Sequence, residues 1–236
     1  MGGDNAPDEV VKGCLEALSV NKQVEIELVG DRKKIEKCLK NCSYDASRLF
    51  ITDAREEITN NDVPTEAIKK KQNSSIVIGL KKMKNKEGDA FISAGSTGAL
   101  LAGSLLITGR MKGVHRPALA PVVPSEGGRN TMIIDAGMNT QVKPINYMQF
   151  GIMGAEYMKH MFGLESPRVG LVNVGTEEKK GNHQLHQAYQ LLKNSNLNFI
   201  GNVEGRDITD GKVDVAVCDG LTGNAMLKVM EGTGRF

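Results

Sequence analysis

One turn of this sequence has the composition of an anion-binding turn. Residues 93–98 read Ser-Ala-Gly-Ser-Thr-Gly, and an apolar helical pattern follows over residues 97–108. Glycines let a backbone approach a ligand closely, hydroxyls donate hydrogen bonds, and the first N–H groups of a helix point toward the turn before it. The turn therefore suits a phosphate or a carboxylate, although the same residues also serve as an ordinary helix cap. It matches neither a Walker A loop nor the Gly-x-Gly-x-x-Gly pattern.

Four further glycine-containing turns place carboxylates, amides and cations after short apolar runs. They are residues 135–144, 173–181, 199–207 and 219–224. In an open sheet of parallel strands, ligands gather outside the carboxyl ends of the strands. One such turn is weak support for a site, but five of them after successive strands predict a shared binding edge.

Histidines and cysteines point to no metal site, cofactor or covalent nucleophile. His183 and His186 are three residues apart on an expected helix without a third ligand, so a solvated pair is favoured over a metal site. Cys14, Cys38 and Cys218 lie in apolar runs, where cysteine acts as a small hydrophobe. The Gly-x-Ser-x-Gly elbow of serine hydrolases is absent from the sequence. We therefore expect a reducing compartment, and a substrate that supplies the nucleophile if the protein is an enzyme.

Composition excludes several classes of protein. The 236 residues include 30 basic and 28 acidic side chains, for a net charge of +2, which argues against a dedicated nucleic-acid binder. With 40% hydrophobic residues the chain is too apolar for disorder, and no uncharged run is long enough to span a bilayer. The start of the sequence lacks the pattern of a secretory signal. The sequence predicts a globular protein of the cytoplasm.

Strand-like and helical segments alternate along the chain. The strand-like runs cover residues 24–29, 49–51, 90–93, 132–135, 169–174, 198–200 and 213–218. Helical patterns cover residues 8–18, 33–40, 65–86, 97–108, 144–162, 180–194 and 224–231. Such alternation predicts crossover connections and a mostly parallel sheet. We expect a three-layer α/β fold with helices on both faces of the sheet.

The two ends of the sequence resemble interior points of a fold. A Gly-Gly turn ahead of a helix normally follows a strand, yet Gly2 and Gly3 have no strand before them, and the last helical pattern runs out at Phe236. We expect a single domain over residues 1–236 that is truncated at both ends.

Taken together, the turns resemble the phosphate acyltransferase family of bacterial phospholipid synthesis (the PlsX family). The matching stretches run through the chain in the order of the family: residues 1–7, 93–101, 116–121, 135–139 with Lys143-Pro144, 173–181, 199–207 and 219–224. Three residues depart from the usual pattern. Ser96 replaces Asn, which alters one hydrogen bond to the ligand, whereas Met138 for Ala and Leu221 for Phe are packing changes.

This resemblance implies a fold similar to isopropylmalate dehydrogenase and phosphotransacetylase, and transfer of a long-chain acyl group from acyl carrier protein to inorganic phosphate. Lys180 and Asn224 would be the catalytic residues, because a fixed cation and an amide donor stabilise the charge that develops on the thioester carbonyl oxygen. The substrate-binding residues implied are Asp4, Ser93, Gly95, Ser96, Thr97, Gly98, Asp135, Asn139, Glu178, Arg206, Asp219, Thr222 and Gly223. A homodimer with peripheral membrane contact is implied as well.

Acyl carrier protein is acidic, and a lysine-rich stretch could meet it. The lysines concerned are Lys69, Lys70, Lys71, Lys81, Lys82, Lys84 and Lys86. A solvated helix face explains these lysines equally well.

Three other functions stay open on the sequence alone. A phosphate acetyl- or butyryltransferase acting on acyl-CoA would share the fold and the leaving group. An inactive adaptor that binds a carrier protein or a membrane would keep the turns without the activity. A dehydrogenase of isopropylmalate type would need an aspartate cluster for a metal and an adenosine site, and the sequence supplies neither.

Overall fold

The computed structural model describes residues 2–234, which form two compact units. Unit 1 comprises Met1–Gly109 and unit 2 comprises Arg110–Phe236. Met1 and Phe236, at the ends of the expected domain, lie outside the described residues. That residues 1–236 work as one acyltransferase domain stays a prediction.

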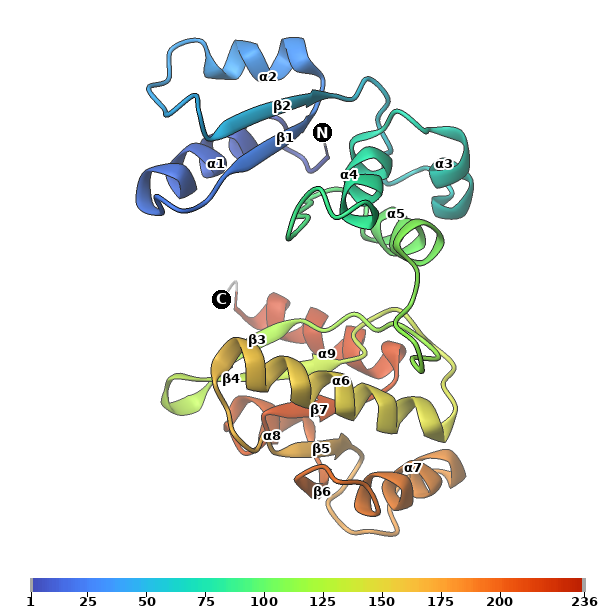
Figure 1. The fold of residues 1–236 in the computed structure, drawn as a ribbon. Coiled ribbons are helices and arrows are strands. Elements are labelled where there is room, and N and C mark those ends of the chain that lie inside the picture. The colour runs from blue at the N-terminus through green and yellow to red at the C-terminus, as the bar shows by residue number, and fades with distance from the viewer. Residues whose placement is uncertain (1, 235–236) are drawn as a thin grey trace. The chain divides into compact units, whose positions relative to one another are not determined.

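The first half of unit 1 is a two-stranded parallel sheet packed with two helices (Figure 1). Its elements are α1 (Asp8–Val20), β1 (Ile26–Gly30), α2 (Arg32–Leu39) and β2 (Leu49–Asp53). Asp31 starts α2 because its carboxylate accepts a hydrogen bond from the Lys34 N–H. Apolar side chains from all four elements, including Val11, Leu28 and Ile35, form one buried cluster.

The second half of unit 1 is helical. It contains α3 (Pro64–Lys70), α4 (Ser75–Lys84) and α5 (Thr97–Gly103), which continues as a π-helical turn over Ser104–Thr108. The prediction of one helix over residues 65–86 is wrong, because Ser74 caps a new helix by accepting from the Val77 N–H. The apolar faces of α3, α4 and α5 share a second buried cluster around Ile68, Val77 and Leu80.

The predicted strand over residues 90–93 is also wrong. These residues pair with no strand in the described part of the chain, and the Ile92 side chain is 92% exposed. A short apolar run marks a strand only where a neighbouring strand and a core are present to receive it. The turn at residues 93–98 therefore follows an irregular segment.

Unit 2 is built on a five-stranded sheet. Its strands are β3 (Val122–Ser125), β4 (Arg129–Ile134), β5 (Val169–Val172), β6 (Phe199–Val203) and β7 (Val215–Val217). They lie in the order β3-β4-β7-β5-β6, with β3 antiparallel to β4 and the other neighbours parallel. The sequence did not indicate β3, which includes Pro124; proline is tolerated in a strand mainly at the edge of a sheet, where β3 lies.

Helices cover both faces of this sheet (Figure 1). They are α6 (Pro144–Phe162) and α7 (His183–Lys193), then α8 (Gly205–Thr209) and α9 (Gly220–Thr233). Phe150 and Met158 of α6 and Leu192 of α7 pack on one face, while Ile208 of α8 and Met226 of α9 pack on the other. The expected three-layer α/β architecture with a mostly parallel sheet is thus confirmed.

An ion pair between the half-buried Arg168 and the buried Asp214 joins β5 and β7 at the ends where both strands begin. The Asp214 carboxylate accepts hydrogen bonds from the Arg168 backbone N–H at 2.7 Å and from the guanidinium Nε and Nη2 at 3.0 and 2.8 Å. Burial by itself raises the pKa of Asp214, but the hydrogen bonds from Arg168 outweigh it and hold that pKa below the usual value. The pair fixes the register of the two strands.

Replacing Asp214 tests this pair. We expect Asp214→Asn to lower the free energy of unfolding by about 3 kcal/mol at neutral pH, because it leaves the Arg168 guanidinium without its counter-charge. A carboxyl with a lowered folded-state pKa contributes stability above its ordinary pKa of about 3.9 and loses it as the pH falls through the folded-state pKa. The difference in the free energy of unfolding between wild type and variant should therefore stay constant from pH 7 to about 5 and become smaller below about 4.

Urea unfolding followed by circular dichroism measures this difference at each pH. Asp89→Asn, an exposed carboxyl, is the matched control and should leave stability unchanged. If the free energies of unfolding of wild type and Asp214→Asn differ as much at the most acidic pH as at pH 7, this role of Asp214 is wrong.

Candidate functional site

The sheet of unit 2 brings four of the predicted turns to one edge. Strands β4, β7, β5 and β6 are parallel neighbours, so the segments after them leave the sheet on the same side. These segments are residues 135–139, 219–224, 173–181 and 204–207. Lys180 and Asn224, the predicted catalytic residues, thus lie on segments that follow two adjacent strands, β5 and β7.

Asp135 shapes the segment after β4 from inside the protein. Its carboxylate is fully buried, with Oδ1 accepting from the N–H groups of Leu119 at 2.9 Å and Met138 at 3.1 Å. Oδ2 accepts from the backbone N–H and the side-chain Nδ2 of Asn139, at 2.6 and 2.8 Å. Because both oxygens already accept hydrogen bonds from the protein, a direct role of Asp135 in substrate binding stays a prediction.

Asn139 connects this segment to two neighbouring segments by hydrogen bonds. Its Nδ2 also donates to the Pro117 carbonyl at 2.8 Å, and its backbone carbonyl accepts from the Gly220 N–H at 2.8 Å. Its Oδ1 accepts from Nη1 of Arg116 at 3.3 Å. Arg116 was not among the predicted site residues, although it opens the matched stretch at residues 116–121; a cation beside that motif was the available signal.

The first turn of α9 packs directly against this segment. Asp219 caps the helix by accepting from the N–H groups of Leu221 and Thr222 and from the Thr222 hydroxyl. Gly220 and Gly223 leave room for the contact, because a Cβ on Gly223 would lie 1.9 Å from the Asp135 carbonyl oxygen. Asn224 reaches Gly137, since a Cβ on Gly137 would lie 3.6 Å from its Oδ1. The amide of Asn224 thus lies beside the segment after β4.

Lys180 belongs to a loop that two asparagines hold together. Asn173 donates from Nδ2 to the Lys180 carbonyl at 2.9 Å, and Asn202 donates to the Glu177 carbonyl at 2.8 Å. The Lys180 ammonium lies 3.7 Å from a Glu177 carboxylate oxygen, and its side chain is half exposed. A weak, exposed pair of this kind leaves the ammonium available to a substrate.

Glu178 and Arg206 have protein partners already. The Glu178 carboxylate accepts from Gln190 and Lys193 of α7, and these hydrogen bonds lower its pKa. Arg206 donates to Glu204 at 2.6 Å. A direct role in substrate binding for either residue stays a prediction, and it would require these exposed pairs to open.

In unit 1, the turn at residues 93–98 combines local caps with a close backbone contact. The Ser93 hydroxyl accepts from the Gly95 N–H at 3.2 Å, and Ser96 caps α5 by accepting from the Ala99 N–H at 3.4 Å. A Cβ on Gly2 would lie 2.9 Å from the Gly95 Cα, so the segment that leads into Asp4 packs on this turn. The helix-cap alternative is therefore confirmed for Ser96, while anion binding by the turn stays a prediction.

The predicted residues divide between the two units. Asp4 and the turn at residues 93–98 belong to unit 1, and all the others belong to unit 2. That both sets serve a single substrate site stays a prediction.

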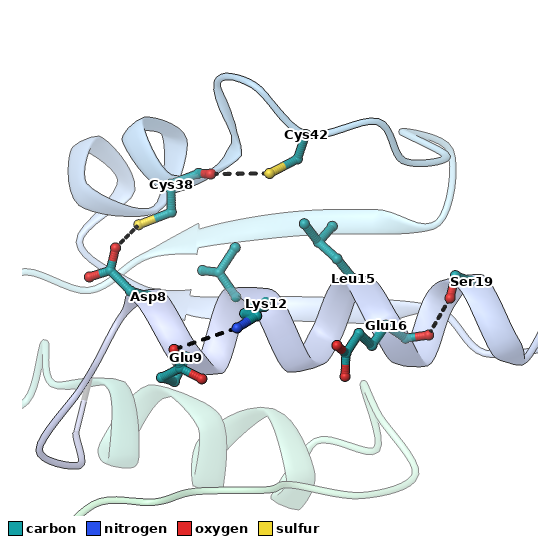
Figure 2. A pocket seen from close by; sticks show the side chains of 9 residues that line it. Asp8, Glu9, Lys12, Leu15, Glu16, Ser19, Cys38 and Cys42 are labelled. Atoms are coloured by element: carbon teal, nitrogen blue, oxygen red, sulfur yellow. Dashed lines mark hydrogen bonds and ion pairs between the residues drawn. The ribbon is translucent and has the colours of Figure 1, made fainter.

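A cavity of about 470 Å³ lies beside α1 and the end of α2, and none of the predicted site residues lines it (Figure 2). Cys38 points toward Asp8 there, with 3.5 Å between its sulfur and the carboxylate oxygen. Burial, followed by the Asp8 hydrogen bond, raises the pKa of the Cys38 thiol. Burial also raises the pKa values of Cys14 and Cys218. These three thiols are therefore protonated at neutral pH and poorly suited to act as nucleophiles.

Within residues 2–234, histidine, cysteine and carboxylate side chains form no group of three or more that could hold a metal ion. None of the helices in that range is long and apolar enough to cross a membrane.

Most of the lysines expected to meet an acidic partner have partners within unit 1. Lys70 pairs with Glu66, Lys71 with Asp62, Lys81 with Gln72, and Lys82 with Glu27 and Glu87. Within the described residues, the side chains of Lys69, Lys84 and Lys86 make no such contact. The available positive surface is therefore smaller than the sequence suggested.

Gly223 offers a direct test of the packing that holds this site. We expect Gly223→Ala to lower the free energy of unfolding by about 3 kcal/mol, because its Cβ would meet the Asp135 backbone and force α9 to shift. Gly232→Ala on the same helix has open space and should gain ~0.5–1 kcal/mol from helix propensity. Far-UV circular dichroism suits this chain, which lacks tryptophan, and equal stability of the two variants would disprove the contact.

Comparisons with known proteins identify the family. A family model described as a fatty acid synthesis protein matches residues 1–236. The phosphate acyltransferase of Acetivibrio thermocellus is 56% identical over 236 residues, which are 100% of this chain and 69% of that protein. The phosphate acyltransferase of Caldanaerobacter subterraneus is 55% identical over 232 residues, 98% of this chain and 68% of that protein.

Solved structures agree with the fold. A phosphotransacetylase from Streptococcus pyogenes superposes with a TM-score of 0.73 at 14% identity, over 98% of this chain and 80% of that one. The EutD phosphotransacetylase from Staphylococcus aureus superposes with a TM-score of 0.70 at 16% identity, over 96% of this chain and 79% of that one. These likenesses concern the fold alone, whereas the sequence matches are decisive for the family. The chain belongs to the fatty acid synthesis protein family, among relatives named phosphate acyltransferases.

Proposed function

We propose that this protein is an acyltransferase that moves a long-chain fatty acyl group from acyl carrier protein to inorganic phosphate, forming acyl phosphate. The observation that carries the proposal is the edge of unit 2, where Lys180 and Asn224 lie on segments that follow adjacent parallel strands. Membership of a family whose members are named phosphate acyltransferases supports the same reaction.

The chemistry is an acyl transfer with phosphate as the nucleophile. A phosphate oxygen attacks the thioester carbonyl carbon, a C–O bond forms, and the C–S bond breaks with its electron pair leaving on sulfur. The departing thiolate takes up a proton from solvent. Negative charge develops on the carbonyl oxygen during attack, and there the Lys180 ammonium and the Asn224 amide donate hydrogen bonds.

Phosphate removes the need for a nucleophile on the protein. It is anionic at neutral pH, so no base has to activate it. The raised thiol pKa values of Cys14, Cys38 and Cys218 fit this division of labour, because those side chains stay neutral. The protein's task is to hold two substrates together and to stabilise the developing charge.

The substrate-binding residues supply hydrogen-bond donors and shape. The hydroxyls of Ser93 and Thr97 are donors suited to an anion, and Gly95 and Gly98 let the backbone approach it closely. Asn139 and Gly223 act mainly by holding the segment after β4 against α9.

The partner, assembly and location follow from the resemblance to the family. We propose acyl carrier protein as the acyl donor, a homodimer, and a cytoplasmic enzyme with peripheral membrane contact. The lysines without partners, Lys69, Lys84 and Lys86, are the cations left to meet an acidic carrier. A phosphate acetyl- or butyryltransferase that uses acyl-CoA is the competing reaction.

Substitution of the two catalytic residues tests the mechanism. We expect Lys180→Ala and Asn224→Ala each to lower kcat by about 10²- to 10³-fold, which is the usual loss when one donor to an oxyanion is removed. Lys179→Ala removes the neighbouring lysine and should retain near-normal turnover. Acyl phosphate formed from acyl carrier protein thioester and phosphate is the quantity measured. A near-normal rate in either variant would exclude that residue from the mechanism.

Charge reversal on unit 1 tests the choice of acyl donor. We expect Lys84→Glu to raise KM for long-chain acyl carrier protein by about 3- to 10-fold, because surface charges steer association with an acidic partner. KM for a short acyl-CoA should not change. Lys22→Glu, an equal charge change elsewhere in unit 1, is the control and should affect neither donor. Equal effects of Lys84→Glu on both donors would rule out carrier docking at this surface.

A further inference from the structure

Arg116 carries a positive charge at the strand-end edge of unit 2 that no carboxylate neutralises. Across residues 2–234 its guanidinium makes a single hydrogen bond, from Nη1 to Asn139, and it takes part in no ion pair. The side chain is exposed. A guanidinium carries five N–H donors in a fixed planar array, so most of its hydrogen-bonding capacity is unused.

The backbone brings Arg116 to this edge by extending the sheet past β4. The Ile133 N–H donates to the Pro121 carbonyl, and the Ala136 N–H donates to the Leu119 carbonyl, at 2.9 and 2.8 Å. The segment ahead of β3 therefore runs alongside the end of β4, in the direction opposite to that strand. Arg116 precedes this segment, so it lies where β4 gives way to the loop at residues 135–139.

Asn139 holds the guanidinium in place. This asparagine is only 6% exposed, and its Nδ2 is fixed by Asp135 and by the Pro117 carbonyl. Its Oδ1 is thereby turned toward Arg116, which it receives at 3.3 Å. The Arg116 guanidinium is thus a cation that a buried side chain tethers beside this loop.

The surroundings of Arg116 favour an anion close to Asn224. Asn139 also touches the first turn of the 14-residue helix α9, whose N-terminus carries partial positive charge. Two carboxylates are near, but Asp135 is saturated by N–H groups, and Asp219 is occupied as the cap of α9. Neither of them pairs with Arg116.

We propose that Arg116 binds the attacking inorganic phosphate and positions it beside the Asn224 amide. This inference rests on the proposed acyl transfer, in which Lys180 and Asn224 serve the thioester carbonyl and leave the phosphate without a cation of its own. A guanidinium matches phosphate with two parallel N–H···O bonds, which fixes the orientation of the nucleophile as well as its location. A productive attack requires the reacting oxygen to lie about 3–3.5 Å from the carbonyl carbon.

Steady-state kinetics with both substrates varied tests the assignment. We expect Arg116→Ala to raise KM for phosphate by about 10- to 100-fold, the range for losing hydrogen bonds to a charged group. KM for the acyl donor should stay within about twofold, since this donor is bound elsewhere. Arg116→Lys retains the positive charge but lacks the two parallel N–H donors, so it should raise KM for phosphate by an intermediate factor. Lys112→Ala, an exposed cation four residues earlier, should leave both constants unchanged.

Two kinetic results would overturn the proposal. One is an unchanged KM for phosphate in Arg116→Ala. The other is a rise in KM for the acyl donor alone, which would assign the guanidinium to the thioester substrate.

A binding measurement that needs no turnover separates this inference from the proposed function. Inorganic phosphate should raise the Tm of the wild-type chain and of Lys112→Ala, because a ligand of the folded state stabilises it. The shift should be lost in Arg116→Ala and partly retained in Arg116→Lys, with chloride at equal ionic strength as the reference salt. If the wild type forms no acyl phosphate yet shows this pattern, the proposed reaction fails and the phosphate site stands. If Arg116→Ala keeps the full shift, the site is elsewhere.

Discussion

The buried carboxylate of Asp135 is the interaction on which the edge of unit 2 depends. Four N–H donors converge on its two oxygens, and they come from the segment ahead of β3 and from the loop after β4. A buried carboxylate is costly unless its oxygens are satisfied, so the loop is held closely to one shape. This shape decides where Asn139 points, and Asn139 in turn touches both Arg116 and α9.

Two glycines allow α9 to pack closely against the loop after β4. Gly220 and Gly223 let α9 approach the backbone of the loop more closely than any side chain would allow, and Asn224 follows directly on that surface. Lys180 reaches the same edge from the next strand, on a loop that Asn173 and Asn202 hold. The chemistry proposed here thus relies on positions that the sheet and its loops determine, and not on an unusually reactive side chain.

Much of the fold could be predicted from hydrophobic patterns. The helix over residues 144–162 has the bounds of α6, since a proline starts it and Gly163 ends it in a left-handed conformation. The buried runs of β5 and β7 were equally clear. The pattern failed for β3, where prolines hid an edge strand, and for residues 90–93, where an apolar run had no partner strand. Pairing between distant segments is invisible to a local pattern.

The candidate site was predictable as a set of segments more than as a set of contacts. The turns after β4, β5, β6 and β7 were identified because glycine and polar residues follow apolar runs. Which side chains are already occupied could not be foreseen: Glu178 pairs with Lys193 of α7, and Asp135 accepts from three backbone N–H groups and the Asn139 side chain. Arg116 could not be predicted as a site residue for the same reason. Its place at the edge of unit 2 depends on a hydrogen bond to Asn139 that forms only in the folded chain.

Whether inorganic phosphate is the acyl acceptor is tested by comparing thiol release with acyl phosphate formation. Purified protein is given long-chain acyl carrier protein with and without phosphate, and both products are quantified over time. We expect thiol release to require phosphate and one acyl phosphate to appear for each thiol released. Thiol release without phosphate, or without a matching amount of acyl phosphate, would show a hydrolase or another acceptor and would rule out phosphate as the acyl acceptor.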